Sequence, residues 1–264
     1  MLHLSDPTLG ELTTFARTLA DQSAEVIRHY FHTGYDVEWK EDATPVTVAD
    51  RKAEEVMREE IMRIYPQHGI LGEEHGHHQS DADYQWVLDP IDGTKSFVAG
   101  TYLFGTLIAL VYQGKPILGV INNPLLNHFL LGVGGGCWLN DRPVRVSSCT
   151  QVDESLLVTT SHRTPAEHRD GVAYETLVSQ VKRYRTWGDC HGYHLVATGG
   201  AEIMTDPILN YWDLMALIPI VEGAGGIITD WYGNDVLLHK GEAGAIATNG
   251  HIHDAVVKIL NPKD

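Results

Sequence analysis

Residues 86–94 of the chain read Trp-Val-Leu-Asp-Pro-Ile-Asp-Gly-Thr. The three leading residues are apolar and predict a short buried strand. Two carboxylates, Asp89 and Asp92, follow this strand on either side of Pro90. Because a proline ring fixes φ, we expect a restrained backbone here and two carboxylates that converge on one point.

The Asp89–Thr94 stretch has the composition of a site for a cation and a phosphate. Mg²⁺ is held in proteins by a few carboxylates together with waters and substrate phosphate, and the carbonyl of Ile91 could add another oxygen. Gly93 and Thr94 then open a helix or turn, whose backbone amides would point at a bound phosphate. Taken alone, the stretch is equally typical of a surface turn, because DP and DG are common turn signals.

Three other places in the chain put an acid at the end of a predicted element. Glu73 and Glu74 follow a short strand, Asp50 lies in the first turn of a predicted helix, and Asp213 heads an apolar helix. Each acid has an ordinary explanation. The glutamates fit a solvated loop, Asp50 fits the helix dipole, and Asp213 fits an N-cap.

The composition of the whole chain limits the class of function. Of its 264 residues, 43% are hydrophobic and 20% are charged, as in ordinary globular proteins. The formal net charge of -16 argues against nonspecific binding to nucleic acid or to an anionic membrane. A phosphate site in so acidic a chain needs local positive charge, and bound metal is the obvious source.

Signals for targeting and for disulfide formation are also absent from the sequence. No run of about 18 apolar residues predicts a transmembrane helix, and residues 1–12 lack the pattern of a signal peptide. The cysteines Cys137, Cys149 and Cys190 are odd in number and widely spaced, which argues against a disulfide framework or a thiolate zinc site. We therefore expect a cytoplasmic protein with reduced thiols.

The order of predicted elements indicates an α/β body in two parts that join near residues 140–155. We predict helices over 12–31, 48–64, 164–180, 192–198, 212–222 and 251–260. We predict strands over 70–71, 86–88, 106–112, 117–121, 129–133, 156–159, 181–186, 202–204, 227–229 and 243–247.

Considered together, these motifs resemble the inositol monophosphatase superfamily, which includes inositol monophosphatases, histidinol-phosphate phosphatases and bisphosphate nucleotidases. The resemblance runs over nearly the whole chain. It is carried by Val46–Asp50, Gly72–Glu74, Trp86–Thr94, and Trp212-Asp213 leading to Gly223–Gly226. It implies a layered αβαβα sandwich with mixed sheets and with helices between and outside them. It also implies an N-terminal α+β subdomain (1–145) with most metal ligands, and a C-terminal α/β subdomain (146–264) with Asp213 and the substrate-selecting residues.

The resemblance also implies a role for each motif residue. The implied metal ligands are Glu73, Asp89, Ile91 through its carbonyl, Asp92 and Asp213. Asp50 and Thr94 are implied to orient and deprotonate the attacking water, Glu73 is counted with them as catalytic, and Gly93 and Thr94 are implied to bind the phosphate. The implied reaction is in-line attack by a metal-activated water on a small-molecule phosphate monoester. Two or three Mg²⁺ ions and a homodimer belong to the same expectation.

Within the superfamily, the chain is most similar to histidinol-phosphate phosphatases, over Trp86–Leu110 and Gly188–Tyr193. Asp189 and Asp206 fall where inositol monophosphatases contact sugar hydroxyls. An extra carboxylate at Asp189 would complement the ammonium group of L-histidinol phosphate, which is therefore the predicted substrate, in histidine biosynthesis.

Other interpretations of the substrate-selecting residues stay open. Asp189 could instead cap a helix that begins near Cys190. Lys95 is a candidate substrate contact, but it does not distinguish between substrates, since bisphosphate nucleotidases resemble the chain there too. Inositol 1-phosphate and a broader range of sugar phosphates are the alternative substrates.

A non-catalytic interpretation rests on His75, His77 and His78. Imidazole clusters suit zinc or nickel, so a His-rich metal-binding protein is the non-enzyme alternative. Such a cluster is more often a mobile, solvated loop.

Overall fold

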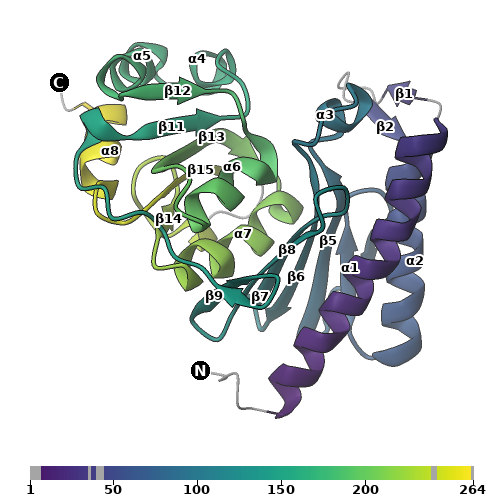
Figure 1. Ribbon diagram of the computed structural model, residues 1–264. Helices are drawn as coiled ribbons and strands as arrows, with labels where there is room; N and C mark the ends of the chain where they lie inside the picture. The colour runs from purple at the N-terminus through teal and green to yellow at the C-terminus, as the bar shows by residue number, and fades with distance from the viewer. Residues whose placement is uncertain (1–6, 35–36, 40–44, 239–242, 263–264) are drawn as a thin grey trace.

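The fold has five alternating layers of helices and sheets (Figure 1). The computed structural model describes residues 7–34, 37–39, 45–238 and 243–262. The layers are α1 (Pro7–Thr33) with α2 (Val48–Ile64), an eight-stranded sheet, α6 (Asp189–Ala197) with α7 (Tyr211–Gly223), a five-stranded sheet, and α4 (Thr164–His168), α5 (Gly171–Gln180) and α8 (His253–Leu260). The predicted αβαβα sandwich is confirmed.

The eight-stranded sheet lies nearer the N-terminus of the chain. Its strands in spatial order are β10 (Arg142–Pro143), β9 (Gly136–Leu139), β8 (His128–Val133), β7 (Lys115–Asn123), β6 (Gly105–Tyr112), β5 (Tyr84–Asp92), β3 (Gly69–Gly72) and β4 (Gly76–His78). All neighbours are antiparallel except β3 and β5, which run parallel with Gly72 opposite Leu88. The carboxyl ends of β3 and β5 therefore lie side by side, so the sheet brings Glu73 next to Asp89.

The five-stranded sheet is built from the second half of the chain. Its strands in spatial order are β12 (Arg183–Arg185), β11 (Leu156–Thr159), β13 (Ile203–Leu209), β15 (Ala243–Thr248) and β14 (Ile227–Thr229). The chain passes from one sheet to the other between Pro143 and Leu156, through the 3-10 turn Val152–Glu154. The division into two subdomains at 145/146 stays a prediction, and α7 packs against strands of both sheets.

Small elements complete the chain. The strands β1 (Val37–Trp39) and β2 (Pro45–Thr47) form a two-stranded sheet, α3 spans Thr94–Val98, and a second 3-10 turn spans Val236–Leu238. None of the helices in the described ranges combines the length and the apolar character needed to cross a bilayer.

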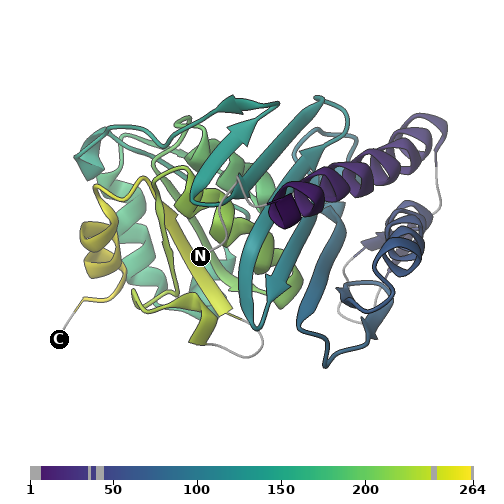
Figure 2. The same ribbon diagram turned by 90° about the horizontal axis from the view of Figure 1, so that it is seen from below.

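Helix α7 lies directly on the eight-stranded sheet because two glycines leave room for it. A β-carbon at Gly119 would lie 2.1 Å from the carbonyl oxygen of Ala216, and one at Gly132 would lie 2.3 Å from that of Pro219. The apolar side chains around this contact form the largest buried cluster, which reaches the five-stranded sheet. Figure 2 shows α1 and α2 on the opposite face of the eight-stranded sheet. The position of α7 matters because its first turn carries Asp213.

The ends of the first two helices follow the sequence signals. Gly34, with φ of 86°, ends α1. Thr47 caps α2, where its hydroxyl accepts a hydrogen bond from the amide of Ala49 at 3.1 Å, and Asp50 completes the capping box. Tyr65 ends α2 directly before a proline, as expected for a residue that precedes proline.

Three predictions about elements are wrong. The predicted helix over 164–180 is two helices, because Asp170 caps α5 by accepting from the amides of Val172 and Ala173. The segment 76–78, expected in a mobile loop, is the edge strand β4, paired with β3. Strand β5 does not end at Leu88 but continues to Asp92.

Four short strands were missed, namely β1, β2, β9 and β10. A tight turn joins β8 to β9, with positive φ at Gly134 and Gly135. Three of these strands lack the period-2 alternation of a half-buried strand, since they are only two or three residues long.

Candidate active site

Three aspartates from two distant parts of the chain converge at one point. One carboxylate oxygen each of Asp89, Asp92 and Asp213 lies within 4.8 Å of the other two. Asp89 and Asp92 lie on β5 and Asp213 on α7. Within the described ranges, no other group of three or more histidine, cysteine or acidic side chains converges in this way. We refer to Asp89, Asp92 and Asp213 as the aspartate cluster.

A β-bulge directs the two aspartates of β5 to the cluster. Asp89 pairs with Leu107 and Asp92 with Gly105, so β5 carries one more residue than β6 between the same pairs. The amide of Ile91 donates to Oδ1 of Asp89 at 3.0 Å, which fixes the bulge from within. Bulges re-aim side chains next to active sites. The feature is thus an irregular strand, and the alternative of a surface turn is wrong.

Asp213 takes part in the N-terminal capping box of α7 and also contributes its carboxylate to the aspartate cluster. Asn210 is the N-cap of α7, and the amide of Asn210 donates to Oδ2 of Asp213 at 2.7 Å in a capping box. Asp213 is therefore not the N-cap itself, as one interpretation of the sequence had it. It is the third residue of the helix, whose N-terminal dipole also favours its negative charge.

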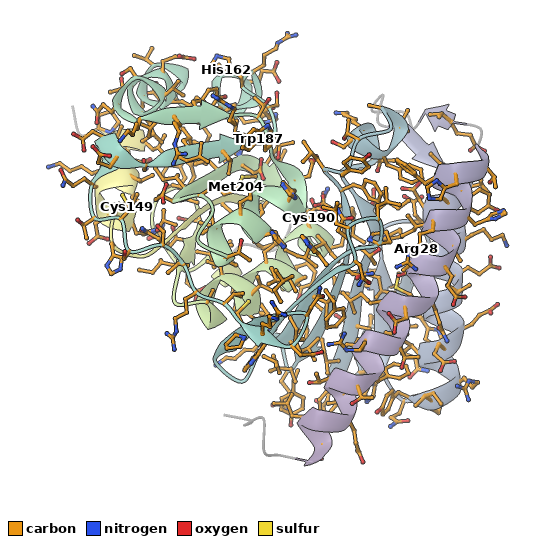
Figure 3. All side chains as sticks on the ribbon, in the orientation of Figure 1. Arg28, Cys149, His162, Trp187, Cys190 and Met204 are labelled. Carbon is orange, nitrogen blue, oxygen red and sulfur yellow. The ribbon has the colours of Figure 1, made fainter. Side chains whose placement is uncertain are left out.

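Two further groups border the cluster. The amide of Glu73 donates to the carbonyl of Leu88 at 3.1 Å, and the carboxyls of Glu73 and Asp89 are close enough to hydrogen-bond. On the other side, the amide of Cys190 donates to Oδ2 of Asp92. Cys190 lies at the boundary between the two halves of the molecule (Figure 3).

The carboxyls of the site are too crowded to ionise together without a cation. Burial raises the pKa of Asp89 and Asp92 well above the usual range, and neighbouring carboxylates add to the shift. Burial, with the charge of Glu73, raises the pKa of Asp213 to about 7. A bound cation would favour the ionised forms. Because every donor is a carboxylate oxygen, the set fits a hard cation such as Mg²⁺.

Asp50 and Thr94 have separate partners. Oδ2 of Asp50 accepts from the amide and the hydroxyl of Thr47, at 2.8 and 2.6 Å. Burial raises the pKa of Asp50 to about 6, against those two hydrogen bonds and with a contribution from Glu74 and Glu73. The hydroxyl of Thr94 donates to the carbonyl of Ile91 at 3.0 Å. The residues expected to act as a pair are thus not hydrogen-bonded to each other.

Gly93 occupies a position that only glycine fits. Its φ of 88° lies in the left-handed region, and a β-carbon there would lie 2.8 Å from the carbonyl oxygen of Leu103. The same β-carbon would lie 3.1 Å from Oδ2 of Asp189. The carboxylate of Asp189 therefore lies close to the start of α3.

The carboxylate of Asp189 faces α3 and does not cap α6. Helix α6 begins at Asp189 itself, and its N-cap Gly188 makes no side-chain cap bond. The amide of Asp189 donates to the hydroxyl of Thr160 at 2.8 Å. Burial raises the pKa of the Asp189 carboxyl to about 6, while Lys95 and a hydrogen bond from Ser96 oppose the shift. Lys95, which is exposed, thus lies near Asp189.

Asp206 lies deeper than a direct substrate contact would be expected to lie. The residue is 3% exposed, and Oδ2 of Asp206 accepts from the hydroxyl of Tyr193 at 3.1 Å. Burial raises its pKa to about 8, with a contribution from Asp189 and against hydrogen bonds from Thr160 and Tyr193. Asp206 is therefore more deeply buried than Asp189 and close enough for its pKa to respond to the charge of Asp189.

Sequence reasoning missed several partners in the site. Thr47 and Asn210 could have been found from local patterns, since each stands three residues before an aspartate at a helix start. Cys190, Thr160 and Tyr193 could not, because they reach the site from distant segments.

The histidines after Glu74 do not form a metal site. His75 Nε2 lies 3.3 Å from the carbonyl oxygen of Arg51, and His78 Nε2 lies 3.1 Å from Nε2 of Gln79. His77 points to solvent on the edge strand β4. In the described part of the chain, these side chains do not converge.

Comparison with known proteins agrees with the fold and identifies the family. Residues 8–263 match the inositol monophosphatase family, and the chain belongs to this family of metal-dependent phosphatases. It is 42% identical to the chloroplastic bifunctional phosphatase IMPL2 of Arabidopsis thaliana, over 94% of the chain and 72% of that protein. It is 38% identical to a histidinol-phosphatase of Chlorobaculum parvum, over 93% of the chain and 95% of that protein.

A solved structure supports the same assignment. An inositol monophosphatase from Zymomonas mobilis superposes with a TM-score of 0.84 at 36% identity, covering 95% of this chain and 98% of that one. The chain is therefore a phosphatase whose relatives include enzymes named for histidinol phosphate and for inositol monophosphate.

Proposed function

We propose that the chain hydrolyses L-histidinol phosphate to L-histidinol and phosphate in a Mg²⁺-dependent reaction. The proposal rests chiefly on the position of the Asp189 carboxylate, which lies beside Gly93 at the start of α3 and accepts a hydrogen bond from Ser96. This position puts a negative group beside the backbone that would bind the phosphate. Histidinol phosphate carries an ammonium group close to its phosphate, and an inositol phosphate carries none.

In this proposal, each acidic residue has a defined task. Glu73, Asp89, Asp92 and Asp213, with the carbonyl of Ile91, would hold two or three Mg²⁺ ions. When bound, these ions supply positive charge for the phosphate and make a bound water more acidic. The aspartates on β5 and α7 would supply the ligands from two rigid elements.

Asp50 would receive the proton of the attacking water. Its Oδ2 already accepts two hydrogen bonds from Thr47, so proton transfer would use Oδ1. A carboxyl with a pKa of about 6 is mostly ionised at neutral pH and is more basic than an ordinary aspartate. The hydroxyl of Thr94 would turn from the carbonyl of Ile91 to orient the water.

The phosphate and the ammonium group would bind on either side of Gly93. The backbone amides of Gly93 and Thr94 would bind phosphate oxygens, with Lys95 close enough to add charge. Asp189 would bind the ammonium group in a charge-assisted hydrogen bond. Asp206 would line the substrate site next to Asp189, mostly as a neutral carboxyl at neutral pH because its pKa is about 8.

Inositol 1-phosphate is the second candidate substrate, and the position of Lys95 favours it. Lys95 lies near enough to Asp189 to lower the pKa of that carboxyl. Part of the negative charge at the site is thus already balanced, which suits an uncharged polyol or another sugar phosphate.

The deciding experiment is phosphate release from histidinol phosphate, inositol 1-phosphate and a 3′,5′-bisphosphate nucleotide, each with and without Mg²⁺. We expect the highest kcat/KM for histidinol phosphate and no turnover after removal of Mg²⁺ with a chelator. Faster turnover of inositol 1-phosphate would reject the substrate assignment. Full activity without Mg²⁺ would reject the metal-dependent mechanism.

We also propose that two chains associate as a homodimer, as expected from the family resemblance. Light scattering on the purified protein should then give twice the mass of the chain, and a mass equal to one chain would reject the dimer.

A further inference from the structure

Glu54 is a fully buried carboxylate outside the aspartate cluster. It lies on α2, one helical turn after Asp50, and its side chain has no solvent exposure. A carboxylate removed from water destabilises a fold unless hydrogen bonds and an opposite charge replace its hydration. The hydrogen-bond partners and the ion-pair partner of Glu54 therefore indicate its role.

Two consecutive backbone amides are the first partners of Glu54. Oε2 accepts from the amide of Glu74 at 2.7 Å, and Oε1 accepts from the amide of His75 at 3.1 Å. Both amides belong to the turn between β3 and β4, directly after Glu73. One side chain of α2 thus fixes the backbone of a turn 20 and 21 residues later in the chain.

Arg58 extends this contact to the end of the turn. Its Nη1 lies 3.2 Å from Oε1 of Glu54 and donates to the carbonyl of Gly76 at 2.9 Å. The pair therefore holds the turn by two amides and one carbonyl. Arg58 also supplies the positive charge that a buried carboxylate needs.

Gly72, at the start of the turn, lets Glu54 approach the backbone. A β-carbon at Gly72 would lie 1.9 Å from Oε1 of Glu54, well inside van der Waals contact. No side chain fits at position 72 while Glu54 keeps its place. The backbone is therefore packed against Glu54 on both sides of Glu73.

The carboxyl of Glu73 depends on this packing for its position. The amide of Glu73 is bonded to the carbonyl of Leu88, next to Asp89, and the Glu73 carboxyl lies within hydrogen-bonding reach of the Asp89 carboxyl. The pairing of β3 with β4 closes the turn at its ends, at Gly72 and Gly76, but inside the turn the two amides after Glu73 are held by Glu54, and without these bonds the turn could shift. Such a shift would carry the carboxyl of Glu73 away from Asp89.

We propose that Glu54, supported by Arg58, is a positioning residue that presents the carboxylate of Glu73 to the cation site. This inference rests on the proposed function, in which Glu73 is a metal ligand. Glu54 bonds to the backbone of the turn and acts on the cation through Glu73. Residues that orient metal ligands typically contribute about 10- to 100-fold to metal affinity.

The test is Mg²⁺ binding to a Glu54→Gln variant of the full chain, measured by calorimetry without substrate. The amide keeps one acceptor oxygen and turns a donor toward the other backbone amide, so one of the two bonds is lost. We expect Mg²⁺ to bind roughly tenfold more weakly, with a smaller fall in kcat at saturating Mg²⁺. The matched control is Glu59→Gln, which removes the same charge from the exposed face of α2 and should bind Mg²⁺ like the wild type.

A double-mutant cycle with Glu73→Gln separates positioning from a general structural effect. If Glu54 acts through Glu73, then Glu54→Gln weakens Mg²⁺ binding no further in a Glu73→Gln background. Additive losses would overturn the inference. Wild-type binding by Glu54→Gln beside weakened binding by Glu73→Gln would also overturn it and leave the proposed function intact. Wild-type binding by Glu73→Gln itself would instead reject the proposed ligand set.

Arg58→Met carries the test if Glu54→Gln does not fold. This variant keeps both amide contacts of Glu54 and removes the contact with Gly76. We expect weaker Mg²⁺ binding in the same direction, and wild-type binding by the folded variant would overturn the proposal.

Discussion

The backbone amide of Cys190 donates a hydrogen bond to Oδ2 of Asp92, across 98 positions of the sequence. The bond joins the start of α6 to the end of β5, and so connects the two halves of the chain at the aspartate cluster. Because Oδ2 is engaged, Asp92 would bind a cation through Oδ1. Asp92 therefore has a structural partner and a proposed cation on different oxygens.

This division predicts the effect of Asp92→Asn. An amide can keep an oxygen toward the Cys190 amide, so the fold should persist, with an unchanged circular dichroism spectrum. The lost charge should lower kcat by at least about a hundredfold, the scale at which one transition-state-stabilising group acts. The measurement is phosphate release at saturating Mg²⁺.

Asp81→Asn is the control for Asp92→Asn, because Asp81 is an exposed acid of the same chain. It should keep wild-type activity. A folded Asp92→Asn protein with wild-type kcat would remove Asp92 from the metal site.

The close approach of α7 to the sheet gives a second prediction, for Gly119→Ala. The new β-carbon would lie 2.1 Å from the carbonyl oxygen of Ala216, so α7 must move away from β7. Overpacking of this kind costs about 1–3 kcal/mol of unfolding free energy. Since α7 carries Asp213, we also expect weaker Mg²⁺ binding. Denaturant unfolding and calorimetry would measure the two effects.

Gly10→Ala is the matched control for Gly119→Ala. Gly10 lies within α1, and a β-carbon there would meet nothing within 4 Å. This variant should be stabilised by roughly 0.5–1 kcal/mol, because alanine favours a helix more than glycine does. A Gly119→Ala protein as stable as the wild type would show that α7 is not held by this contact.

The sequence predicted the parts of the site that depend on local chemistry. The apolar run before Asp89, the helix that has Asp50 in its first turn and the apolar helix of Asp213 are local signals, and each predicted element is present. The parallel pairing of β3 with β5 has no local signal, although it is what brings Glu73 to Asp89. The prediction of one helix over 164–180 did not recognise Asp170 as the N-cap of a separate helix, α5.

The hydrogen bond between Cys190 and Asp92 is another contact of the site that could not be predicted from the sequence. It depends on how the two halves pack, which no spacing within either half encodes. The burial of Asp206 under Tyr193 is of the same kind. The resemblance to the family implied which residues form the site. Their hydrogen-bond partners from distant segments were found only in the structure.

Asp189→Asn tests the residue on which the substrate proposal depends. Asp189 has φ of 49°, and asparagine tolerates the left-handed region better than most residues. The substitution should thus remove the charge with little backbone strain. A charge-assisted hydrogen bond contributes about 1.5–3 kcal/mol, so kcat/KM for histidinol phosphate should fall roughly 10- to 100-fold.

The readout for Asp189→Asn is the ratio of two substrates. Turnover of inositol 1-phosphate should change much less, because it has no ammonium group to lose a partner. An equal loss for both substrates would assign Asp189 to the general integrity of the site, against a role in selecting histidinol phosphate.

His194 gives a prediction about stability and pH. Its ring is buried, stacks on the rings of His128 and His191 at 5.4 and 5.8 Å, and has no hydrogen bond at either nitrogen in the described structure. Burial, with the two neighbouring histidines, lowers the pKa of His194 to about 4. The folded state therefore favours the neutral ring, whereas an unfolded histidine has a pKa of about 6.5.

Stability linked to His194 is thus complete above pH 6.5 and is lost as the pH falls toward 4. The loss can reach about 3 kcal/mol, since one pKa unit corresponds to about 1.4 kcal/mol. His194→Phe keeps an aromatic ring and removes the titrating nitrogens. Its free energy of unfolding, measured in denaturant between pH 7.5 and 4.5, should fall less steeply than that of the wild type. His29→Phe, at an exposed position of α1, should follow the wild-type curve, and parallel curves for His194→Phe and the wild type would contradict the role of His194.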